Sequence, residues 1–101
     1  MLAQFSIVPV GAGSSLSGQL ASVLKLVDGS GLPYKLNPMG TVVEGDWDEI
    51  MGLIKSCRNE IMKEQERVLI SISIDDRKGM PNRIEAKISS LEEKVGRTLK
   101  K

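Results

Sequence analysis

The sequence predicts an α+β fold in which two helices cover one face of an open four-stranded sheet and a third helix follows. Two observations lead to this prediction. Alternating apolar and polar residues mark the strands, and three segments with apolar residues at helical spacing lie between and after them. The order is strand, helix, strand, strand, helix, strand, helix. With 101 residues and 41% apolar content, the chain supports one core and a single domain, residues 1–101.

The first strand and the first helix are joined by a link of small residues. Residues 2–8 alternate in polarity and end at Pro9, which is typical of a strand. The link spans residues 11–15. After it, apolar residues at the spacing of one helix face predict a helix that stops at Gly29. These apolar residues are Leu16, Leu20, Val23, Leu24 and Val27.

Two short strands, residues 32–37 and 41–44, flank a turn of unusual composition. The turn is Asn37-Pro38-Met39-Gly40-Thr41. A hairpin turn needs only Gly, Asn or Asp, so a Met and a Thr beside the Gly indicate contact with a ligand. We therefore interpret this turn as one wall of a binding pocket.

The second helix and the last strand have clear patterns. The helix begins at Asp46, which can form a capping box with Glu49. Residues 68–75 alternate more regularly than any other segment and predict a strand. The stripe of the second helix that we expect to be buried consists of Trp47, Ile50, Ile54, Cys57 and Ile61.

A last helix is predicted over about residues 83–99, with Asn82 and Glu85 as capping residues. It follows a turn near Gly79. One face of this helix is apolar and consists of Ile84, Ile88, Leu91, Val95 and Leu99.

This order of elements most directly generates a ferredoxin-like β-α-β-β-α-β sandwich with an added C-terminal helix. Both main helices then cover one sheet face. The opposite face, which we call the open face, carries small hydroxyl and apolar residues and almost no charge, so we expect it to mediate self-association. The alternative is that its serines simply face solvent. The expected residues of the open face are Gln4, Ser6, Val8, Asn37, Leu69, Ser71 and Ser73.

Composition limits the chemistry of the chain. One cysteine, Cys57, and no histidine exclude an internal disulfide, a Cys/His zinc cluster and a histidine general base. The net charge of +1 disfavours nucleic-acid binding. No apolar run reaches the roughly 18 residues of a membrane span, and no secretory signal is recognisable. We expect a cytoplasmic protein without catalytic activity, metal or cofactor.

Other polar and aromatic residues have a functional and a structural interpretation. Residues 11–15 can present amides to a polar ligand, or can form a plain link with a Ser cap. Asp75-Asp76-Arg77 can orient a ligand, but internal ion pairing is commoner. Trp47 can flank a ligand ring or belong to the core. Cys57 is expected to be a small buried hydrophobe.

Three motifs taken together resemble the small thiamine-binding protein family. They are Phe5-Ser6-Ile7-Val8-Pro9-Val10-Gly11 with Gly13-Ser14-Ser15, then Tyr34-x-Leu36-x-Pro38-Met39-Gly40-Thr41-x-x-Glu44-Gly45, and then Ile72-x-Ile74-Asp75-Asp76-Arg77. The match runs over nearly the whole chain. The resemblance implies a ferredoxin-like fold, assembly as homodimers or homotetramers, and binding of thiamine or its hydroxymethylpyrimidine moiety without catalysis.

The residue types present suit this implied ligand. An aminopyrimidine offers one exocyclic donor, two ring acceptors and a flat apolar face. Glu44 can accept from the amine. Ser6, Thr41 or the amides near Gly40 can donate to ring nitrogens. Met39 or Trp47 can cover the ring. Glu44 can equally be a charge turned to solvent. The predicted ligand-binding residues are Ser6, Ser14, Met39, Gly40, Thr41, Glu44 and Trp47.

Two alternatives to this function are open. In the first, the chain is an oligomeric regulatory or interaction protein with no small ligand, and the turn merely shapes an interface. In the second, it is a small phosphate-cleaving enzyme, because acyl phosphatases share the ferredoxin-like architecture. Such an enzyme needs a basic residue in an anion-binding loop, and residues 11–15 contain none.

Overall fold

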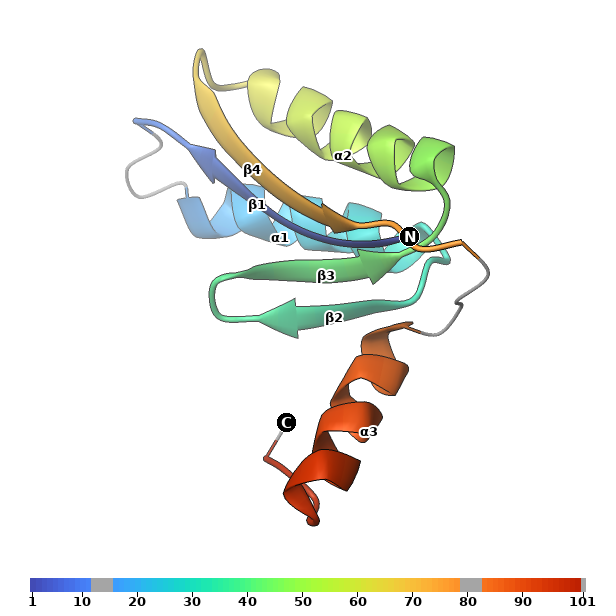
Figure 1. Cartoon of the computed structure of the whole chain (residues 1–101). Coiled ribbons are helices and arrows are strands. Elements are labelled where there is room, and N and C mark those ends of the chain that lie inside the picture. The colour runs from blue at the N-terminus through green and yellow to red at the C-terminus, as the bar shows by residue number, and fades with distance from the viewer. Residues whose placement is uncertain (12–15, 79–82, 101) are drawn as a thin grey trace.

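The computed structural model describes residues 1–11, 16–78 and 83–100 (Figure 1). It confirms the predicted α+β class and the predicted order of elements. The elements are β1 (Leu2–Pro9), α1 (Leu16–Gly29), β2 (Tyr34–Asn37), β3 (Gly40–Glu44), α2 (Trp47–Met62), β4 (Val68–Asp75) and α3 (Arg83–Val95).

The four strands form one antiparallel sheet in the order β2-β3-β1-β4. Helices α1 and α2 lie side by side on one face, as Figure 1 shows, and this is the predicted ferredoxin-like arrangement. The core between the helices and the sheet draws on both helices and on β1 and β3. Its buried residues are Ala3, Phe5, Ile7, Val23, Val27, Val43, Ile50, Leu53, Ile54, Cys57 and Ile61.

The strand register confirms how the side chains divide between the two faces. Phe5 lies opposite Ile72 and Thr41, in a row that faces the helices. Ser6 lies opposite Ser71, one residue further along, in a row on the open face. Residues directly opposite one another share a sheet face, and successive residues of a strand alternate between the two faces. The face of every other strand residue follows from these two rows. The middle of the open face therefore has the polar, uncharged composition expected from the sequence. The same register places Lys35, Glu44 and Asp75 on this face as well, so its margins are charged.

Helix α2 begins with the predicted capping box. The Asp46 carboxylate accepts a hydrogen bond from the Glu49 amide at 2.8 Å, and the Glu49 carboxylate accepts one from the Asp46 amide at 3.0 Å. The expected burial of Trp47 in the stripe of this helix is wrong, because the side chain is 57% exposed. Trp47 is the first residue of α2 and precedes the turn that packs on the sheet. Leu53 is buried in the stripe instead.

Helix α3 projects from the sheet beyond β2 and β3 (Figure 1). Polar contacts attach its first turns: the Ile84 amide donates to Glu44 Oε1 at 3.4 Å, and Lys87 forms an ion pair with Asp75. The helix ends at Val95 rather than near residue 99, because Gly96 adopts a left-handed conformation at φ +84°. The predicted cap Asn82 lies outside the described residues.

Candidate ligand-binding site

A cleft of about 500 Å³ lies between the β2–β3 turn, strand β1 and helix α1. Among the described residues its lining is mostly apolar and includes no charged side chain, and the Thr41 hydroxyl is a side-chain polar group on the helix-covered side of the sheet. Uncharged clefts of this size with a few polar groups are typical of sites for small ring-containing molecules. The lining residues are Phe5, Ser6, Ile7, Val8, Leu20, Val23, Leu24, Leu36, Asn37, Pro38, Met39, Gly40 and Thr41.

Strand pairing and an incompletely packed helix create this cleft. Thr41 lies between Phe5 on β1 and Leu36 on β2, in the row that faces the helices. Leu20 and Leu24 approach from α1, yet they remain 37% and 38% exposed. Helix α1 therefore does not close onto the hairpin, and apolar surface on both sides stays accessible.

Gly40 lets the hairpin approach β1 closely. A Cβ atom at this position would lie 3.1 Å from the Phe5 carbonyl oxygen and 3.3 Å from the Gln4 side chain. The first of these neighbours is backbone inside the sheet and has little freedom to move. A side chain at position 40 would therefore crowd the local packing of the turn, which positions Met39 and Thr41 at the cleft.

Four of the seven predicted ligand-binding residues line the cleft: Ser6, Met39, Gly40 and Thr41. Met39 is 84% exposed at the tip of the turn, so its thioether is free to fold over a bound ring. Ser6 belongs to the row on the open face, so its side chain and that of Thr41 leave the sheet on opposite sides.

The structure places Glu44 and Trp47 away from this cleft. Glu44 lies three residues beyond Thr41 on β3, about 10 Å along an extended strand. There its carboxylate accepts the hydrogen bond from the first turn of α3. Trp47 is exposed at the start of α2. Ser14 lies outside the described residues. Their roles as ligand-binding residues stay predictions.

The perturbed ionisable groups also lie outside the cleft lining. Tyr34 donates a hydrogen bond to Asp28 at 2.7 Å, and this bond raises the pKa of the Tyr34 phenol. Burial raises the pKa of the Cys57 thiol to about 11. The lining residues that the structure describes include no acidic, basic, cysteine or tyrosine side chain.

Leu20, Leu24 and Leu36 line the cleft, although the sequence did not single them out as functional residues. The first two belong to the apolar face predicted for α1. The apolar face of α1 carries three leucines besides its two valines, and this width is the signal that the sequence offers. In the structure only Val23 and Val27 of α1 are buried. A stripe wider than the core requires leaves apolar surface for another contact.

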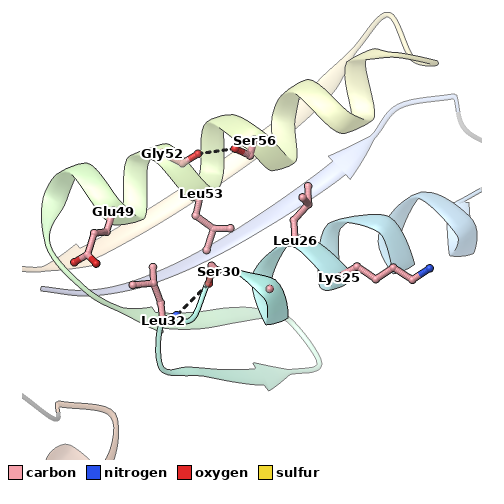
Figure 2. Close-up of a pocket in the computed structure, with 9 residues that line it drawn as sticks. Lys25, Leu26, Ser30, Leu32, Glu49, Gly52, Leu53 and Ser56 are labelled. Carbon is pink, nitrogen blue, oxygen red and sulfur yellow. Dashed lines mark hydrogen bonds between the residues drawn. The ribbon is translucent and has the colours of Figure 1, made fainter.

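A second groove lies between the C-terminal half of α1 and the start of α2 (Figure 2). Figure 2 shows Leu32 and Leu53 pointing toward one another at its base. Three of its polar side chains are engaged within the chain: the Ser30 hydroxyl donates to the Val27 carbonyl at 2.6 Å, the Ser56 hydroxyl donates to the Gly52 carbonyl at 3.0 Å, and the Glu49 carboxylate accepts from the Asp46 amide. Its lining also carries the charges of Lys25 and Glu49. This groove is therefore less suited to recognising a polar ring than the cleft at the hairpin.

No helix within the described residues has the length and apolar character needed to cross a membrane.

The fold is that of a small ferredoxin-like protein, and the cleft at the hairpin is its candidate ligand-binding site. The chain belongs to the thiamine-binding protein family, whose sequence pattern matches residues 3–92. This confirms the resemblance found in the sequence.

Several relatives match over nearly their whole length. A UPF0045 protein of Methanocaldococcus jannaschii is 36% identical over 93 residues, which cover 92% of this chain and 93% of the relative. The UPF0045 protein YqgV of Bacillus subtilis is 31% identical over 96 residues, covering 89% and 92%.

Solved structures agree with the fold. A crystal structure of the Methanocaldococcus protein has a TM-score of 0.81, with 91% of this chain and 95% of that chain covered. A Thermotoga maritima protein proposed to act in thiamine biosynthesis or salvage has a TM-score of 0.77 at 24% identity, with 89% and 96% covered. At that identity the second likeness bears on the fold alone.

Proposed function

We propose that this protein binds thiamine or its hydroxymethylpyrimidine moiety, without catalysis, in the cleft between the β2–β3 turn and α1. The observation that supports this most is an uncharged, mostly apolar cleft with the Thr41 hydroxyl in one wall and Met39 at its rim. Membership of the thiamine-binding family supports the choice of ligand.

The chemistry of the cleft favours the pyrimidine half of thiamine. The Thr41 hydroxyl can donate to a ring nitrogen or accept from the exocyclic amine, and the leucines and Met39 supply an apolar surface for the ring. A thiazolium cation or a phosphate group would stay at the solvent-exposed opening of the cleft, because the described lining residues carry no charge that could pair with it. We therefore propose that the pyrimidine ring is the part recognised.

The absence of catalysis is part of this proposal. The chain has no histidine, and the described residues of the cleft lining include no titratable side chain, which supports binding rather than acid–base chemistry. The proposed role is that of a carrier, buffer or sensor of the ligand.

Isothermal titration tests the proposal. Hydroxymethylpyrimidine and thiamine should both release or absorb heat on binding, and saturating ligand should raise the melting temperature. A thiazole alcohol without the pyrimidine is the matched control and should bind far more weakly. Absence of heat and of a thermal shift with both pyrimidine compounds at millimolar concentration would end this proposal.

A second candidate function is supported by the open face. Ser6, Ser71 and Ser73 form a polar, uncharged surface in the middle of this face, which suits contact between subunits better than contact with solvent. We therefore also propose self-association as a homodimer or homotetramer. If no small ligand binds, an oligomeric interaction or regulatory protein is the function that remains.

A further inference from the structure

The groove between α1 and α2 has opposite charges at its two ends and leucines between them. Its volume is about 380 Å³, which is within the range of sites for small molecules. Figure 2 shows Glu49 at one end and Lys25 at the other, with Leu26, Leu32 and Leu53 between them. The hairpin cleft differs, because its described lining carries no charge. The groove is therefore suited to another class of ligand.

The leucines form a base that the fold holds in place. Leu26 and Leu32 are partly buried and pack against the core, and Leu53 of α2 belongs to the core itself. An apolar group that enters the groove thus meets a surface that is already formed, so little side-chain freedom is lost on binding.

Two glycines line this groove, one from each helix, although neither is needed for packing. Gly29 ends α1, and Gly52 lies inside α2. A Cβ atom at either position would meet nothing within 4 Å, and neither glycine has a positive φ. Glycine inside a helix lowers stability relative to alanine, so Gly52 has a cost that the fold does not require. The missing side chains keep the groove open above the leucines.

Both charged groups can bind a ligand without losing an existing contact. The Lys25 ammonium forms no ion pair or hydrogen bond with the described part of the chain. Figure 2 shows its side chain extended away from the leucines, so turning this flexible side chain toward the groove breaks no interaction. Glu49 Oε1 accepts from the Asp46 amide, and the second carboxylate oxygen has lone pairs for another donor.

We propose that this groove binds a small zwitterion with an apolar body, the chemistry that free apolar amino acids and their dipeptides share. The ligand carboxylate pairs with the Lys25 ammonium, and the ligand ammonium pairs with the Glu49 carboxylate. The apolar body covers the leucines at the base. The two protein charges lie at opposite ends of the groove, so a dipeptide, whose own charges are further apart, fits better than a single amino acid.

This site is separate from the proposed pyrimidine site. No described residue lines both the groove and the hairpin cleft. The zwitterion proposal does not depend on thiamine binding, and either proposal can fail without the other. Titration with hydroxymethylpyrimidine tests the cleft, whereas titration with a dipeptide tests the groove.

Mapping of amide chemical shifts by NMR tests the groove with leucyl-leucine as the probe. Saturable shifts should centre on residues 25–32 and 49–56. The matched control is N-acetyl-leucyl-leucine amide, which keeps the apolar body without either charge and should bind roughly tenfold more weakly or worse. Free leucine distinguishes the two sources of the ligand: weaker binding than leucyl-leucine assigns a dipeptide, and tighter binding assigns an amino acid.

Charge-removing substitutions test the two ends of the groove separately. Glu49→Gln removes the charge and still completes a capping box with Asp46. Lys25→Met removes the ammonium and keeps an unbranched side chain. Each should weaken leucyl-leucine binding by about 3- to 10-fold. Lys55→Met, at an exposed lysine of α2 outside the groove lining, is the matched control and should leave the affinity unchanged.

Filling the groove is a further test. Gly52→Leu should abolish leucyl-leucine binding while α2 stays helical, because leucine favours a helix over glycine. Circular dichroism verifies the fold of this variant, and Lys25→Met, at an exposed position, keeps the test independent of it. Three results would each overturn the proposal: no saturable shifts in the groove at millimolar leucyl-leucine, equal binding of the blocked peptide, or unchanged affinity in both charge-removing variants.

Discussion

At the scale of single residues, the cleft depends on Thr41 and Gly40, which are neighbours on β3 with different roles. Thr41 presents a hydroxyl to the helix-covered side of the sheet, between Phe5 and Leu36. Gly40 has no side chain and so permits the close approach to the Phe5 carbonyl. One residue thus supplies the polar contact, and the other sets its position.

Thr41→Val should weaken binding of hydroxymethylpyrimidine by about 1–2 kcal/mol, roughly 5- to 30-fold, because it keeps the branched shape and removes the hydroxyl. Isothermal titration measures the effect. Thr98→Val, at the only other threonine of the chain, is the matched control and should change the affinity less than twofold. Unaltered affinity in Thr41→Val would remove this hydroxyl from the site.

Gly40→Ala should destabilise the fold by about 1–3 kcal/mol and weaken ligand binding, because the added methyl is forced against backbone in the sheet. Urea unfolding measures the stability. Gly18→Ala is the control: a Cβ there meets nothing within 4 Å, and alanine favours the helix, so stability should rise by about 0.4–1 kcal/mol. Equal stability of the two variants would contradict the packing account of Gly40.

The Cys57 thiol should react slowly in the folded protein. Its raised pKa, about 11, leaves far less thiolate at pH 8 than the ordinary thiol pKa near 8.5 allows, by more than about a hundredfold. Labelling with iodoacetamide should therefore be much slower in buffer than in urea and should quicken as the pH rises toward 11. Similar labelling rates in buffer and urea at pH 8 would show that the thiol is accessible.

At the scale of elements, carboxylates accept hydrogen bonds from the first turns of α2 and α3, but they come from different parts of the chain. Helix α2 has its own capping box, formed by Asp46 and Glu49, whereas α3 borrows Glu44 from β3. The apolar residues Leu91 and Val95 near the end of α3 are more than half exposed. Helix α3 is therefore attached mainly at its first turns, and its far end adds little to the core.

Asp46→Ala should lower the free energy of unfolding by about 0.5–2 kcal/mol, because the Glu49 amide loses its acceptor at the start of α2. Urea denaturation followed by circular dichroism measures the change. Asp48→Ala removes a carboxylate from the same turn without removing the cap, and should cost less. A larger loss for Asp48→Ala would contradict this assignment of the cap.

Glu44→Ala should loosen α3, because its carboxylate accepts the hydrogen bond from the Ile84 amide. Hydrogen–deuterium exchange should be faster in the first turns of α3, while the core amides of α2 stay protected. Glu66→Ala, at an exposed glutamate before β4, is the control. Unchanged exchange in α3 would show that Glu44 does not hold this helix.

At the scale of the whole molecule, the periodicity of apolar residues predicted the helices and strands well, but it predicted where they begin and end less well. Alternation in β1 and β4 gave the correct faces, because each sheet face has one environment over its whole length. The burial of Trp47 was predicted wrongly, because the apolar spacing of α2 does not show at which residue the helix begins to contact the sheet. The end of α3 was misplaced because apolar spacing continues to Leu99, beyond the glycine that stops the helix.

The candidate site followed from the sequence only where its residues are close along the chain. Met39, Gly40 and Thr41 come from one turn, so their joint position in the cleft was predictable. Leu20 and Leu24 come from α1, and only the packing distance between helix and hairpin shows that they stay exposed. Glu44 shares the motif with Thr41, but an extended strand separates the two by about 10 Å.

The central claim is that the cleft at the β2–β3 turn binds a pyrimidine, and mapping of amide chemical shifts by NMR tests it most directly. On addition of hydroxymethylpyrimidine, the largest shifts should fall on residues 39–41 and on Leu20 and Leu24 of α1. The amides of α3 and the Leu32–Leu53 groove should stay nearly unchanged. Saturable shifts centred on Glu44 and α3, or on that groove, would contradict the account.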